Sequence, residues 1–203
     1  YKPKDRDTLK KLLERMIEVR GDEGDFNDID TSDITSMVSL FYFNETFNGN
    51  ITGWNVSSVI FMDSMFRGAK SFNQDISKWE FPNVERMKCM FCEASSFNQD
   101  ISKWKFPKVT DMSYMFSDAT SFNQPIGNWE FPKVENMSGM FKEAKSFNQP
   151  IGDWEFPNVK DMSSMFYNAT SFNQDLSKWD LKGKNKTEIF NGCPIKDEYK
   201  PKM

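Results

Sequence analysis

Hydrophobic and polar positions follow two periods along this chain, and the periods succeed each other in a fixed order. Trp79 and Phe81 alternate with Lys78 and Glu80, which predicts a short strand with one face buried. A proline follows and is expected to end that strand, because it has no N–H group for a ladder. Over residues 84–94 the apolar positions are three and four residues apart, which predicts a short helix or helical turns.

This pattern recurs every 25 residues, and all six tryptophans keep the step: Trp54, Trp79, Trp104, Trp129, Trp154 and Trp179. One unit alone cannot bury its Trp, Phe and Met side chains, whereas stacked units can. The pattern therefore predicts an α/β solenoid of the leucine-rich-repeat type, with about seven 25-residue coils that each contain one short parallel strand and one short helix. The Asn after each repeated Phe is expected to satisfy backbone groups from coil to coil.

The two ends of the chain depart from the repeat. We expect residues 1–27 to form an N-terminal amphipathic capping helix and an acidic linker, residues 28–193 to form the solenoid, and residues 194–203 to form a C-terminal tail or a linker to a further unit. One residue is missing ahead of Ile189, so the last copy is a closing half-repeat. Tyr-Lys-Pro-Lys at the start returns at 199–202, which suggests a unit of a longer tandem chain.

The capping helix is expected over residues 5–20, where one apolar stripe contains Leu9, Leu12, Leu13, Met16 and Ile17. Such a helix can cover the first coil of a repeat array from water. A helix that binds a partner or a membrane surface is the alternative. It is less favoured because the polar side carries charges of both signs.

Composition narrows the classes of function. The chain has no histidine, which removes the commonest general base and the commonest zinc ligand. Its net charge of −4 does not suggest nucleic-acid binding, and no apolar run is long enough for a membrane span, so we expect no direct membrane insertion of this segment. We expect no enzyme activity, no catalytic residue, no cofactor and no metal ion.

Two local patterns could hold a metal ion, and neither is convincing. Cys89 and Cys92 form a C-x-x-C, but both positions vary between the units and are interpreted as tolerant surface positions. A local disulfide and free thiols both remain open for this pair. The acidic segment 21–33 lacks the order of oxygen ligands that a calcium loop needs, which favours a solvated linker.

The repeated frame is Ile-x-x-Trp-x-Phe-Pro-x-Val-x-x-Met-x-x-Met-Phe-x-x-Ala-x-Ser-Phe-Asn-Gln. It resembles the BspA-like leucine-rich repeats of bacterial surface proteins, and in particular the Met-Phe and Phe-Asn-Gln variant of a mycoplasma protein family of unknown function. The resemblance covers residues 28–193. It implies an extracellular or bacterial cell-surface location, a role in adhesion or host interaction, and no catalytic residues.

We therefore expect a protein-binding repeat domain whose ligand is a host cell-surface or extracellular-matrix protein. A structural stalk or spacer in a tandem array and a carbohydrate-binding module are the alternatives. Residues that flank each Trp are expected to point away from the core, because side chains alternate across a strand. They form the candidate protein-binding face: Lys78, Glu80, Lys103, Lys105, Asn128, Glu130, Asp153, Glu155, Lys178 and Asp180.

Overall fold

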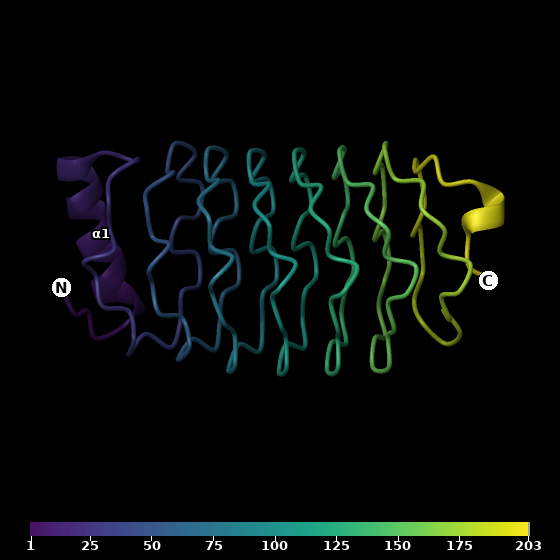
Figure 1. Ribbon diagram of the computed structural model, residues 1–203, viewed down its shortest axis with the longest axis horizontal. Coiled ribbons are helices and arrows are strands. Elements are labelled where there is room, and N and C mark those ends of the chain that lie inside the picture. The colour runs from purple at the N-terminus through teal and green to yellow at the C-terminus, as the bar shows by residue number, and fades with distance from the viewer. Residues whose placement is uncertain (203) are drawn as a thin grey trace.

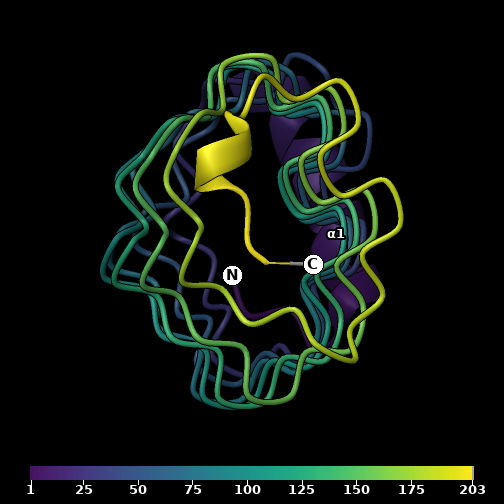
Figure 2. The ribbon, with the colours of Figure 1, turned by 90° about the vertical axis from the view of Figure 1, so that its right-hand side faces the viewer.

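The protein is a stack of similar coils that follow one another along a single axis (Figure 1). The computed structural model describes residues 1–202. Helix α1 (Arg6–Arg20) lies at one end of the stack, and a short 3-10 helix, η1 (Asp197–Tyr199), lies at the other. Seen along the axis, the coils superpose closely (Figure 2), so residues one repeat apart lie over each other.

The predicted solenoid of strand-and-helix coils is wrong. Within residues 1–202 the coils contain neither a β-strand nor an α-helix, and adjacent coils are joined by isolated parallel bridges of one residue pair each. One row of these bridges runs from Ser36 through Phe61, Arg86 and Asp111 and ends on the pair Asp161 and Asn185. The step is 25 residues throughout and 24 at the last bridge, as expected from the residue missing ahead of the closing half-repeat.

Hydrogen bonds between coils occur in the segment for which a helix was predicted. The backbone N–H groups of Met62, Ser64 and Phe66 donate to carbonyls of the next coil, at 3.0, 2.8 and 2.9 Å, whereas that of Met65 donates to Met62 in its own coil at 3.2 Å. Ser64 has a φ of 56° and Gly68 a φ of 70°, the left-handed conformation that turns of the type II class require at their third residue. The chain here is a run of tight turns.

The predicted strand around each Trp is a turn that ends at the Trp, followed by residues without regular secondary structure. The N–H of Trp79 donates to the carbonyl of Ile76 at 3.0 Å, and in the described chain no backbone hydrogen bond joins residues 79–82 to a neighbouring coil. Trp79 and Phe81 nevertheless point inward and are 3% and 2% exposed. The alternation of apolar and polar residues therefore reports the inward and outward directions of side chains, and a segment without regular secondary structure can satisfy it as well as a strand.

The core consists of continuous columns of Trp, Phe and Met, as the repeat predicted. Met115 and Phe122 are fully buried, and the rings of Phe97 and Phe122 are stacked with centroids 6.1 Å apart. The indole N–H of Trp129 donates to the carbonyl of Ile101 in the preceding coil at 3.1 Å. The same bond recurs at every other repeated Trp except Trp79, whose N–H has no acceptor within residues 1–202.

The predicted asparagine ladder is confirmed. Each Asn side-chain oxygen accepts a hydrogen bond from the backbone N–H of the Asn one coil later, at 2.9 Å at all five steps from Asn48 to Asn173. The ladder ends where Lys196 donates its N–H to Asn173 at 3.0 Å. The asparagine side chains thus satisfy backbone N–H groups that have no strand partner.

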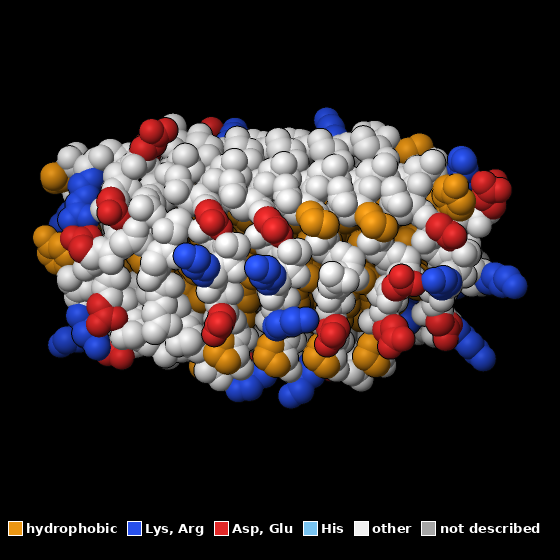
Figure 3. All heavy atoms as spheres, viewed as in Figure 1, with side chains coloured by type: hydrophobic (Ala, Val, Ile, Leu, Met, Phe, Trp, Pro, Cys, Tyr) orange, Lys and Arg blue, Asp and Glu red, His pale blue; other side chains and the backbone are white. Residues whose placement is uncertain are grey.

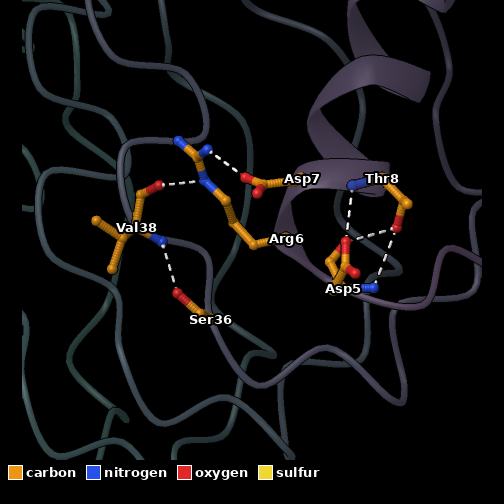
Figure 4. Close-up of polar contacts among 6 residues, drawn as sticks. All are labelled: Asp5, Arg6, Asp7, Thr8, Ser36 and Val38. Atoms are coloured by element: carbon orange, nitrogen blue, oxygen red, sulfur yellow. Dashed lines mark hydrogen bonds and ion pairs between the residues drawn. The ribbon is translucent and has the colours of Figure 1, made fainter.

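Helix α1 closes the N-terminal end of the stack. Asp5 caps the helix by accepting from the N–H of Thr8 at 2.8 Å, and this bond lowers the pKa of Asp5. Leu9 and Leu13 are buried against the first coil. The Arg6 guanidinium donates to the carbonyl of Val38 at 2.9 Å (Figure 4). In the next coil the equivalent carbonyl, that of Asp63, accepts from the preceding coil, and α1 replaces that missing partner for Val38.

The acidic segment after α1 is part of the stack. Phe26 is fully buried, and Asp25 forms a parallel bridge with Asn50. The N–H of Asn48 donates to the carbonyl of Asp22 at 2.9 Å, so this segment supplies the partner below the first rung of the asparagine ladder. The segment therefore serves as a partial first coil in addition to connecting the helix to the array.

Candidate functional site

All ten residues of the candidate protein-binding face are exposed. Each flanks a Trp whose side chain is buried, and equivalent members in successive coils are one repeat apart. One side of the stack carries separate positive and negative side chains along its length, with a row of hydrophobic side chains beneath them (Figure 3). The stack thus presents different side chains at equivalent positions of a regular frame.

Grooves lie beside these residues where two coils meet. Three grooves occupy equivalent positions, with volumes of about 290, 420 and 270 Å³. We call them the first, second and third junction grooves. The Trp-x-Phe-Pro segment of one coil and the exposed residues of the next line each of them: Trp79 to Pro82 with Lys103, Lys105 and Pro107; Trp129 to Pro132 with Asp153, Glu155 and Pro157; Trp154 to Pro157 with Lys178, Asp180 and Lys184.

The local sequence explains why the surface is hollowed there. Trp and Phe turn into the core, the residue between them turns outward, and an exposed proline such as Pro82 forms the rim. Proline has no N–H group to donate to the neighbouring coil. Because residues 79–82 make no backbone hydrogen bond across the junction, the two coils leave a groove between their outer side chains.

The charge of the grooves changes along the stack. The first contains Lys103 and Lys105 with one carboxylate, whereas the second contains three carboxylates and no cation. Within residues 1–202 neither Lys103 nor Lys105 takes part in an ion pair. Both lysines are therefore available to a ligand.

One ion pair bridges the second and third grooves. Lys178 lies 2.7 Å from a carboxylate oxygen of Asp153, and this hydrogen bond raises the pKa of Lys178. Both side chains are largely exposed, so the pair contributes little to stability. It leaves Glu130 and Glu155 as the free charges of the second groove.

The structure also bears on the metal, calcium-loop and membrane sites considered from the sequence. The part of the chain that the structure describes contains no group of three side chains placed to hold a metal ion. In the acidic segment, Asp28 accepts two hydrogen bonds from Arg20 at 2.8 Å, which lower its pKa. No helix within residues 1–202 combines the length and the apolar character that crossing a membrane requires.

The interpretation of Cys89 and Cys92 as surface positions is wrong. Both are buried, at 7% and 6% exposure. The neighbouring Cys92 thiol lowers the pKa of Cys89 to about 7, while the neighbouring Cys89 and burial raise the pKa of Cys92. Arg67 is 25 residues before Cys92, so the repeat predicts that Arg67 lies next to Cys92 in the preceding coil, and this was the one feature of the sequence that indicated a charged neighbour for the pair.

Comparison with known proteins gives one match. The sequence model of the family described as "Mycoplasma protein of unknown function, DUF285" matches residues 9–125 and 99–199. No curated protein and no solved structure matches the chain.

Proposed function

The chain belongs to the DUF285 family of mycoplasma proteins of unknown function, and from this premise we propose that it is a protein-binding repeat domain displayed at a bacterial cell surface. The proposed role is adhesion or host interaction, without catalysis. Its resemblance to BspA-like surface repeats supplies the cell-surface location and the adhesive role in this proposal.

The observation that carries the proposal is the repetition of junction grooves with different charges on a constant frame. Core columns keep Trp, Phe and Met at every repeat, while the exposed positions change from lysine to carboxylate. Repeat proteins commonly bind extended ligands along such a surface. A protein segment that crosses successive coils is therefore the favoured ligand.

Each groove offers the segment two kinds of contact. Exposed prolines at the rim, such as Pro107 and Pro132, supply apolar surface. Lys103 and Lys105 attract carboxylates of the ligand, and Glu130 and Glu155 attract its basic residues. The proposed ligand is consequently a protein surface or segment with acidic and basic groups in separate places, such as a host cell-surface or extracellular-matrix protein.

A structural spacer is the second candidate, favoured by the hydrogen-bonded ladder that runs through the whole stack. A carbohydrate-binding module has less support. Sugars stack on exposed aromatic faces, whereas Trp104 and Trp129 are 1% and 3% exposed.

Surface plasmon resonance against a panel of extracellular-matrix and cell-surface proteins tests the proposal. The double variant Lys103→Glu, Lys105→Glu is compared with a matched control, Lys88→Glu, Lys145→Glu, which reverses two exposed lysines elsewhere. We expect the first variant to associate roughly tenfold more slowly at low salt and with weaker salt dependence, because steering acts on the association rate. The control keeps the parent rate.

Two results would contradict the proposal. If both double variants weaken binding equally, binding depends on the net charge of the chain and not on the candidate face. Binding by neither the parent nor the control, to any member of the panel, favours the spacer. Thermal unfolding of each variant checks that the fold is intact, since exposed substitutions usually change stability by less than about 0.5 kcal/mol.

A further inference from the structure

Cys89 and Cys92 lie in the hydrogen-bonded run of turns, away from the junction grooves. The N–H of Cys92 donates to the carbonyl of Cys89 at 3.2 Å, which closes a β-turn over the two residues. A β-turn holds its first and last Cα atoms within about 7 Å, and a disulfide needs about 4.4–6.8 Å. Both side chains are buried on this turn, and each thiol shifts the pKa of the other.

A charged network surrounds the pair. The guanidinium of Arg67, one coil earlier, lies beside Cys92 and forms an ion pair with Glu93 at 3.2 Å. The Cys92 thiol in turn points at the Glu93 carboxylate, with sulfur and oxygen 3.8 Å apart. A cation next to a thiol favours its thiolate, and a carboxylate next to a thiol can accept its proton. The other charged groups that act on the pair are Lys88 and Asp111.

We propose that Cys89 and Cys92 are a redox-active dithiol that low-molecular-weight disulfides, of the glutathione class, convert reversibly to an intramolecular disulfide. The Cys89 thiolate attacks one sulfur of the small disulfide, forms a mixed disulfide and releases the first small thiolate. Cys92 passes its proton to Glu93 and attacks the Cys89 sulfur, which releases the second small thiolate. Two protein thiols and one small disulfide thus become one protein disulfide and two small thiols.

Three features suit this chemistry. The Cys92 thiol donates to Glu93 and has a raised pKa, whereas the pKa of Cys89 is lowered, so Cys89 is the attacking group and Cys92 the resolving group. Exposure of only 7% and 6% admits a small reagent to the sulfurs more readily than another protein. The disulfide closes a loop of four residues, and short loops gain little stabilisation from cross-linking, which keeps the bond reducible.

Mass spectrometry of the chain after incubation with oxidised glutathione tests the proposal. We expect the loss of two hydrogen atoms, a cross-link within the peptide that contains Cys89 and Cys92, and recovery of the starting mass with dithiothreitol. Cys193, whose pKa burial raises, stays reduced. A cross-link to Cys193, or stable glutathione adducts on both Cys89 and Cys92, overturns the proposal, as does a pair that stays reduced.

Serine variants separate the two roles, and the fold should accept them because Ser64 and Ser117 occupy the same positions in adjacent coils. Cys92→Ser should stop at a glutathione adduct on Cys89. Cys89→Ser should form an adduct on Cys92 much more slowly. Equal rates for the two variants overturn the assignment of Cys89 as the attacking thiol.

Arg67 is assigned as a positioning residue, and its test is a pH profile. Arg67→Gln should move the rise of the reaction rate to higher pH and slow the reaction near pH 7 by roughly threefold for each unit by which the pKa of Cys89 rises. Arg67→Lys, which keeps the charge, should restore much of the rate. A profile that neither substitution moves shows that Arg67 has only a structural role.

Discussion

The asparagine ladder gives the sharpest test of how the coils are held together. The side-chain oxygen of Asn123 accepts from the N–H of Asn148 at 2.9 Å and from the side-chain amide of Gln149 at 3.0 Å. Alanine at 123 removes this acceptor and leaves a half-buried backbone N–H without a partner. An unsatisfied buried donor costs about 1–3 kcal/mol, and partial access to water places the expected loss near 1–2 kcal/mol.

Aspartate at the same position separates the hydrogen bond from the shape of the side chain. The rung at Asn123 uses its oxygen, and its amide nitrogen donates to no group within residues 1–202. Asn123→Asp keeps the acceptor and should therefore unfold close to the parent at neutral pH. The two N–H donors depress the pKa of the new carboxyl group, so its contribution is present above about pH 4, the unfolded value, and is lost as the pH falls through the folded pKa.

Urea unfolding at pH 7 and at pH 3 measures both effects. Asn128→Ala, which removes an exposed asparagine, is the matched control and should change the free energy of unfolding by less than about 0.5 kcal/mol. The reasoning fails if Asn123→Ala costs no more than this control. It also fails if Asn123→Asp is as destabilising as alanine at pH 7.

Three further predictions concern the core, a backbone contact and pH. Trp104→Ala should cost about 3–5 kcal/mol by urea unfolding, because the indole is 1% exposed; a loss below about 1 kcal/mol contradicts the stacked core. Gly139→Ala brings a Cβ against the Tyr114 ring at a left-handed φ of 59° and should cost about 1–3 kcal/mol, with the part due to the ring recovered when Tyr114→Ala is added, as a double-mutant cycle would measure. Asp75 and Asp100 each have a pKa lowered by hydrogen bonds from the serine two residues on, so their contribution to folding stability is present above the ordinary value of 3.8 and is lost as the pH falls through the lowered pKa. The urea midpoint of unfolding should therefore fall between pH 5 and pH 2, and a constant midpoint contradicts this.

The sequence identified which side chains are buried but assigned the wrong backbone conformation, for a physical reason. Spacings of three and four residues, as at Met62, Met65 and Phe66, are produced by a helix and also by consecutive turns that close over three residues. The turns need left-handed residues, and Glu93 and Tyr114 adopt this conformation although neither residue type favours it. Residue type therefore gave no local signal for the turns.

For the candidate protein-binding face too, the sequence predicted which side chains are exposed but not the shape of the surface. Residues such as Lys103 and Glu130 are exposed, as predicted, because side chains alternate inward and outward around each Trp although no strand forms there. The junction grooves depend on how far adjacent coils separate where they share no hydrogen bond, which a single unit does not encode. Cys89 is likewise buried, although the equivalent position in other coils is occupied by Ser64, Tyr114 and Gly139.

The coil-to-coil hydrogen bonds also determine how such a chain can change length during evolution. The upper and lower faces of an internal coil are complementary to each other, as the donors at Met62 and Phe66 and the equivalent donors one repeat later show. Duplication or deletion of one whole internal repeat therefore recreates every junction. A change of another length displaces the donors and acceptors of an internal coil, and the one-residue deletion in this chain lies in the last coil of the stack. Unequal recombination in whole repeats can thus reorder the charges on the outer surface while the interior stays the same.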